Sequence, residues 1–267
     1  MTDLATEMLW QAGGASVRGK SHERSDMPNQ DAFSFRPDGR PANRTVLAVS
    51  DGHGSPKSFR SDVGSGLAVE AAVEALDWFF DDADVFAADG SLANDIVTAW
   101  RTKVDAHRAQ HPLPAGSDET SYLPYGATLI CAGITETLLV AIQIGDGDLL
   151  LGYQDGFIEK PLPDDQGLVG EETYSLCLPN AAEAARIHVA ERSAVSAWPD
   201  FLFLSTDGIA KSFATDSDYL AVGDSYRTLA MDDFEAALAG APEWLTDVTQ
   251  KGSGDDVTLC LAARRAP

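Results

Sequence analysis

The chain has 267 residues, 44% of them hydrophobic, which is enough to bury a sizeable core in one large domain or two small ones. It carries 42 acidic residues against 19 basic ones, a net charge of −23. Such an acidic surface repels nucleic acid and anionic membranes, so we expect neither as a partner. A phosphorylated substrate would need positive charge from elsewhere, and carboxylates can provide it by holding metal ions.

Cysteine usage and the N-terminal segment point to a cytoplasmic protein. Cys131, Cys177 and Cys260 lie far apart without CxxC spacing, which favours neither a disulfide framework nor a zinc site. The first ten residues, MTDLATEMLW, contain acids where a signal peptide has a basic segment. No apolar run approaches the length of a transmembrane helix.

Short apolar runs bounded by Gly, Asp or Asn predict strands, and amphipathic segments between them predict helices. In the first helix, Val69, Val73, Leu76 and Phe80 form an apolar stripe at steps of four, three and four. In chain order we expect strands Ala32–Phe35 and Thr45–Ser50, helices Gly66–Asp82 and Leu92 to about Gln110, strands Ala127–Ile134, Leu138–Ile144, Leu149–Tyr153 and Phe201–Ser205, a helix from Asp232 to about Leu238, and strand Val257–Ala262.

The remaining segments read as loops, and nothing divides the chain. His111–Tyr125 holds three prolines, and Glu159–Asn180 is also mostly irregular. We see no linker and no internal repeat, so residues 1–267 are expected to form one domain. The order of the elements predicts an α+β fold with antiparallel sheets covered by helices.

Acidic residues recur at the ends of the predicted strands. Any one of them is typical of an ordinary Asp-Gly turn. If the strand ends converge, however, the carboxylates form a cluster that cannot all stay ionised without cations, and Mg²⁺ or Mn²⁺ would suit their oxygens. The residues are Asp31, Asp51, Asp146, Asp207 and the adjacent pair Asp255 and Asp256.

Six motifs containing these acids follow one another in a recognisable order. They are Asn29–Phe33, Val49–Gly54 with its Asp-Gly-His-Gly core, Tyr125–Leu129, Ile144–Asp146, Leu204–Gly208 and Gly254–Thr258. From about Gly19 to Ala262 the series resembles the metal-dependent protein phosphatases of the type-2C (PPM) family. The segment Gly19–His22 followed by Pro28–Asp31 is similar to a bacterial subgroup of that family.

The resemblance implies a four-layer αββα sandwich with two metal ions, Mn²⁺ or Mg²⁺, at one end. Asp51 would bridge both ions, the Gly52 carbonyl would bind one, and Asp207 and Asp255 would hold the other. Asp31 is the acid of the first motif, and Asp146 resembles the residue that supports a third, weaker ion. With Asp51, His53 would be catalytic, as the general acid toward the leaving alkoxide. Whether Asp255 or Asp256 is the ligand stays open.

Two positions depart from the family pattern. Gln30 stands where the first motif usually has an acid, and Asp26 stands where many members carry a phosphate-binding arginine. Lys20, His22 or Arg24 could replace that arginine as the substrate-binding residue, and the sequence does not choose among them. Arg18 reads equally well as a surface charge.

The expected function is a serine/threonine protein phosphatase that hydrolyses phosphomonoesters with metal-activated water. Its substrate would be a phosphoserine or phosphothreonine protein, paired with a Ser/Thr kinase. The alternative is a catalytically weakened phosphatase-like module that binds phosphorylated partners, which Gln30 favours. An acidic Ca²⁺-binding domain is a third reading, but no recognisable loop supports it.

In the family a variable flap near the metals influences substrate choice, and residues 159–180 lie where it would fall.

Overall fold

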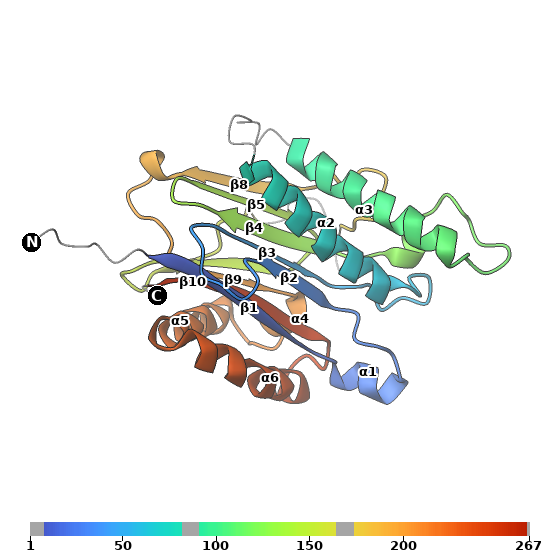
Figure 1. Cartoon of the computed structure of the whole chain (residues 1–267). Helices are drawn as coiled ribbons and strands as arrows, with labels where there is room; N and C mark the ends of the chain where they lie inside the picture. Colours follow the sequence, from blue (N-terminus) through green and yellow to red (C-terminus); the bar gives the residue numbers. More distant parts are fainter. Residues whose placement is uncertain (1–7, 82–90, 164–173, 266–267) are drawn as a thin grey trace, which may run out of the picture.

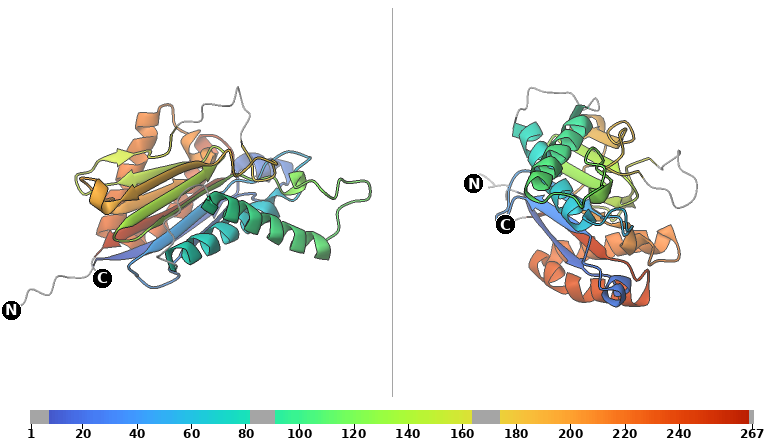
Figure 2. Two further views of the ribbon diagram at one scale, coloured as in Figure 1. Left: turned by 90° about the horizontal axis from the view of Figure 1, so that it is seen from above. Right: turned by 90° about the vertical axis from the view of Figure 1, so that its right-hand side faces the viewer.

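Two antiparallel five-stranded sheets lie face to face in the computed structural model, which describes residues 8–81, 91–163 and 174–265 (Figures 1 and 2). The first sheet has the strand order β1 (Leu9–Val17), β10 (Val257–Arg265), β9 (Phe201–Ser205), β6 (Asp148–Gly152) and β7 (Ile158–Glu159). The second has the order β2 (Ala32–Arg36), β3 (Thr45–Ser50), β4 (Leu129–Ile134), β5 (Leu138–Ile144) and β8 (Arg186–Glu191).

Helices cover the outer face of each sheet, so the molecule has four layers (Figure 1). Helices α2 (Ser61–Asp81) and α3 (Ser91–Gln110) pack on the second sheet, and α5 (Asp216–Asp232) and α6 (Phe234–Lys251) pack on the first. Shorter pieces are α1 (Lys20–Ser25), α4 (Asp207–Ala210) and the 3₁₀ turns η1 (Leu123–Tyr125) and η2 (Arg192–Ala194). Among the described helices none has the length and apolar character needed to span a bilayer. The expected α+β sandwich is confirmed.

The central strands are apolar on both faces because each sheet is covered on both sides. In β4, Leu129 and Cys131 face the helices α2 and α3, whereas Ile130 and Ala132 face the other sheet. This double burial produces the continuous apolar runs that predicted β3, β4, β5 and β9 from the sequence.

Helices α1, α4 and α5 and strands β1, β7 and β8 were not predicted from the sequence, and three of them show why. Strand β1 contains Gly13 and Gly14, and it is fixed by pairing with β10 along its whole length. Strand β8 lies at a sheet edge with no fully buried residue. Helix α5 did carry a signal, since its four buried residues recur at steps of four, three and four and Thr215 accepts a hydrogen bond from the Asp218 N–H as N-cap.

Two helix boundaries also differ from the prediction. Helix α2 begins at Ser61, five residues early, and the expected end at Asp82 lies outside the described residues. Helix α6 does not stop near Leu238 but continues through Pro242 to Lys251. Packing of Ala241, Leu245 and Val248 against the first sheet outweighs the backbone hydrogen bond that a proline cannot donate.

The registers bring the acidic strand ends to one end of the sandwich. Ala32 pairs with Ser50, which places Asp31 beside Asp51 at the edge of the second sheet. Ser205 pairs with both Leu259 and Asp148 in the first sheet, so the segments carrying Asp207 and Asp255 end there too. The convergence expected from the sequence is therefore present.

Close approach of α2 to η1 gives a stability prediction. A Cβ atom at Gly64 would lie 2.1 Å from the carbonyl oxygen of Tyr125, whereas one at Gly66, on the same helix, would meet nothing within 4 Å. We expect Gly64→Ala to destabilise the fold by about 1–3 kcal/mol and Gly66→Ala to be neutral or stabilising by up to about 1 kcal/mol. Urea unfolding of both variants is the measurement, and equal effects would contradict the packing described.

Candidate metal centre

Four carboxylates lie near enough to that of Asp51, at this end of the sandwich, for their charges to act on it. Burial raises the pKa of Asp51 well above its ordinary value, and the charges of Asp31, Asp207, Asp255 and Asp146 raise it further. Part of the Asp51 side chain remains exposed, but protein groups surround its carboxylate. Sequence reasoning had selected these five residues, and the fold places them within reach of one another's charge.

Asp31 has one carboxylate oxygen bound and the other free. The Thr206 hydroxyl donates to Asp31 Oδ2 at 2.7 Å, while Oδ1 is buried and has no hydrogen-bond partner. Burial raises the Asp31 pKa to about 8, and the charges of Asp256 and Asp207 act in the same direction. A buried acceptor without a donor is costly, and a cation would satisfy it.

Asp207 is the first residue of α4 and is almost fully buried. Burial, followed by the charge of Asp146, raises its pKa to about 7, and an ion pair with Lys211 opposes that rise. Asp146 is therefore near enough to Asp207 for its charge to act on that carboxylate.

The backbone around Asp51 is held tightly. Thr128 Oγ1 accepts from the Asp51 N–H at 3.1 Å, and the Thr128 N–H donates to the Asp51 carbonyl at 2.8 Å. A Cβ atom at Gly52 would lie 2.6 Å from the carbonyl oxygen of Ser61 and 2.7 Å from that of Gln30. Only glycine fits there, so the Asp-Gly pair is fixed by packing as well as by turn preference.

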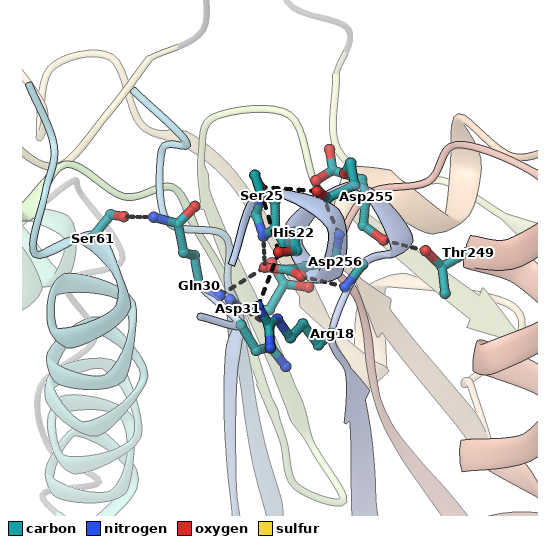
Figure 3. Close-up of polar contacts among 12 residues, drawn as sticks. Arg18, His22, Ser25, Gln30, Asp31, Ser61, Thr249, Asp255 and Asp256 are labelled. Atoms are coloured by element: carbon teal, nitrogen blue, oxygen red, sulfur yellow. Dashed lines mark hydrogen bonds and ion pairs between the residues drawn. The ribbon is translucent and has the colours of Figure 1, made fainter. Parts of the chain in front are cut away.

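The doublet Asp255 and Asp256 divides into two environments (Figure 3). The buried Asp256 carboxylate accepts from the Gly19 N–H at 2.5 Å and the Gln30 N–H at 2.7 Å, and it pairs with His22 Nδ1 at 2.8 Å. Asp255 instead adds its charge at Asp51 and Lys211. The geometry therefore favours Asp255 as the ligand and makes Asp256 an anchor for the N-terminal segment, a role that sequence reasoning missed.

His53 packs against Gly126, near the carboxylate of Asp146. A Cβ atom at Gly126 would be 2.7 Å from His53 Cδ2, and the His53 N–H donates to the Gly126 carbonyl at 3.0 Å. Burial lowers the pKa of His53, and the charge of Asp146 partly opposes that shift. The imidazole is thus held near Asp146, as a group that gives up its proton more readily than an ordinary histidine.

The three candidate phosphate binders all belong to α1. Lys20 Nζ donates to the Gln250 carbonyl at 3.0 Å, His22 is bound to Asp256, and Arg24 is exposed. Arg18, which the sequence left as a surface charge, donates from Nη2 to the His22 carbonyl at 2.9 Å, and its Nε is buried without a partner. Nothing in this arrangement selects one of the three.

Gln30 is buried and links the centre to α2. Its side-chain Nε2 donates to the Ser61 hydroxyl at 2.6 Å, and the Ser65 hydroxyl donates to the Gln30 backbone carbonyl at 2.5 Å. The Oε1 atom is buried without a partner. A neutral side chain here keeps one negative charge out of the cluster and still leaves an oxygen acceptor.

The donor set fits divalent metal ions by its chemistry. Carboxylate and carbonyl oxygens are the ligands that Mg²⁺ and Mn²⁺ prefer, and the free Asp31 Oδ1 is available to one. Within residues 8–81, 91–163 and 174–265, no three His, Cys, Asp or Glu side chains stand close enough together to form a ready-made chelate. The carboxylates are thus near enough to affect the ionisation of Asp51 without forming a chelate on their own among the described residues.

Comparisons with known proteins bear on the family and the fold. A family model described as protein phosphatase 2C matches residues 18–247. The catalytic domain of the serine/threonine protein phosphatase PstP in complex with two manganese ions has TM-score 0.59 and 18% identity, covering 97% of this chain and 99% of that one. Stp1 from Staphylococcus aureus has TM-score 0.60 and 16% identity, covering 98% of each chain. A search among curated protein sequences gave no match.

The raised carboxyl pKa values predict how metal-free stability depends on pH. Asp31 and Asp207 titrate at about 8 and about 7 when folded, against an ordinary value of 3.8, so protonation favours the folded state. We expect their contribution to be complete below about pH 4 and lost as pH rises through 7 and 8. Mn²⁺ binds the ionised forms, so it should raise the thermal unfolding temperature more at about pH 8.5 than at about pH 6. An increase that is equal at both pH values would contradict this.

Proposed function

Because this chain belongs to the protein phosphatase 2C family, we propose that it removes phosphate from phosphoserine or phosphothreonine in proteins, with divalent metal ions as cofactors. The observation that supports this most directly is the convergence of five aspartates beside a half-buried histidine. A binding module without catalysis has no need of the whole set. When bound, the ions neutralise phosphate charge and lower the pKa of water.

The chain's own residues supply the positioning. Asp51 and the Gly52 carbonyl sit on a turn fixed by Thr128 and Ser61, which keeps their oxygens in place. Asp207 and Asp255 are next to strands β9 and β10 of the first sheet, whereas Asp51 follows β3 of the second. His53 would deliver a proton to the serine or threonine oxygen as the phosphate ester bond breaks.

The finer assignments extend the same proposal. We infer two ions, Mn²⁺ or Mg²⁺, and a Ser/Thr kinase that supplies the phosphoprotein in the cytoplasm. Residues 1–267 would act as one phosphatase domain. The alternative is a phosphatase-like module that binds phosphorylated partners. Gln30 favours it, because Gln30 replaces an acid and its side-chain amide is hydrogen-bonded to Ser61.

The flap expected at residues 159–180 lies partly outside the described residues, which omit 164–173. The described part after that gap lies beside the metal centre. The Leu176 N–H donates to the Ala127 carbonyl at 2.9 Å, and the Ser175 hydroxyl donates to the same oxygen at 3.1 Å. This position supports a contribution of the segment to substrate choice.

Metal dependence separates the phosphatase from the binding module. We expect hydrolysis of p-nitrophenyl phosphate and of a phosphothreonine peptide with Mn²⁺ or Mg²⁺, and none with EDTA, since the centre offers carboxylates and no activated nucleophile of its own. Full turnover in EDTA would refute the metal centre. Tight phosphopeptide binding without turnover under any metal would favour the binding module.

Two ligand substitutions test the assigned residues. Asp51→Asn and Asp207→Asn each remove the charge of a proposed metal ligand. Mutating residues that only hydrogen-bond to metal ligands lowers activity by about 10- to 100-fold, so we expect turnover to fall by more than that. Asp247→Asn is the matched control, since Asp247 pairs with Lys251 on the exposed face of α6. Circular dichroism would confirm that each variant is folded. Near-normal turnover in either ligand variant would show that the site is misplaced.

A further inference from the structure

A lysine side chain reaches into the carboxylate cluster. Lys211 Nζ forms an ion pair with Asp207 Oδ2, and its pKa is raised by the charges of Asp207, Asp146 and Asp255, against burial that lowers it. Among the described residues, no other lysine or arginine forms an ion pair with the five aspartates of the centre. The ammonium group is therefore the cation that the chain itself provides there.

The position of Lys211 is fixed by α4 and by the loop that follows α6. The Lys211 N–H donates to the Asp207 carbonyl at 2.8 Å, which places the two side chains one helical turn apart. The Ser212 hydroxyl donates to the Gly208 carbonyl at 2.8 Å and accepts from the Ser253 N–H at 3.0 Å. The end of α4 is thus held against residues 252–253, and Lys211 is kept facing the centre.

The contact removes one oxygen from the set open to metal ions. Asp207 is 8% exposed and its Oδ2 is engaged by Lys211, so Oδ1 is the oxygen left for an ion. The charge of Asp146 acts on the same carboxylate, and a further divalent ion between Asp146 and Asp207 would stand beside the positive charge of Lys211. Two cations so close repel each other strongly in a partly buried site.

We propose that the Lys211 ammonium group takes the place of a third cation beside Asp146 and Asp207, so that this centre binds two divalent ions and excludes a third. This inference rests on the metal centre of the proposed function. It makes Lys211 a positioning residue that sets metal stoichiometry and keeps part of the Asp207 charge neutralised in the absence of metal.

Counting bound Mn²⁺ tests the proposal without measuring activity. The probe is Mn²⁺ alone, with free ion followed by electron paramagnetic resonance during titration of the full chain. We expect two bound ions in the wild type and three in Lys211→Met, with the added ion lost again when Asp146→Asn is combined with it. Lys211→Arg keeps the charge and should bind two. Lys251→Met is the matched control, because Lys251 forms the same i,i+4 pair with an aspartate, at 2.7 Å on the exposed surface, and it should bind two.

The possible results separate the lysine from the metal centre. Three ions in the wild type, or two in Lys211→Met, would overturn the role of Lys211 while leaving the metal centre intact. Fewer than two ions in the wild type would overturn both. Lys211 is 58% exposed, so its replacement should leave the fold stable, and thermal unfolding of each variant confirms this.

Discussion

Repulsion among partly buried carboxylates is the constraint on which this end of the molecule depends. Asp31, Asp51 and Asp207 all have raised pKa values because burial and neighbouring negative charge penalise ionisation together. Such a cluster would push the two sheets apart unless the strands that carry it were tied in the interior. The tie is the apolar layer between the sheets, formed by residues such as Leu47, Ile130 and Leu204. Burial of this apolar layer thus offsets the unfavourable free energy of repulsion among the carboxylates.

Much of this arrangement could be predicted because the sheets are buried on both faces. Runs such as Thr45–Ser50 and Leu138–Ile144 are largely apolar and fully or almost fully buried, so their limits were predicted to the residue, and the acids at their ends followed. Strand β1 could not be found in this way, since its place depends on a partner about 240 residues later in the chain. The choice between Asp255 and Asp256 needed the fold as well. Only the arrival of the Gly19 and Gln30 N–H groups shows which carboxylate is already satisfied.

Local sequence also gave no warning that Lys211 would enter the site. Lys211 follows the Leu204–Gly208 motif with no feature that singles it out, and α4 is a helix of four residues that no periodicity could reveal. The same short helix places Gly208 against Asp256, where a Cβ atom would lie 2.2 Å from the Asp256 carbonyl oxygen. The roles of residues that follow an Asp-Gly turn can therefore be assigned only from the folded structure. Gln30 is a similar case, because its tie to Ser61 appears only once α2 is extended to that residue.

The pairing of β1 with β10 has a consequence for how the chain is made. Strand β10 lies between β1 and β9, so the first sheet cannot be completed until residues 257–265 have left the ribosome. Asp255, just before β10, arrives at the same late moment. The second sheet can assemble earlier, since β2 to β5 and β8 are all synthesised before residue 192. A nascent chain would therefore carry half of the sandwich with its inner apolar face uncovered, and it would depend on chaperones or rapid completion to avoid aggregation.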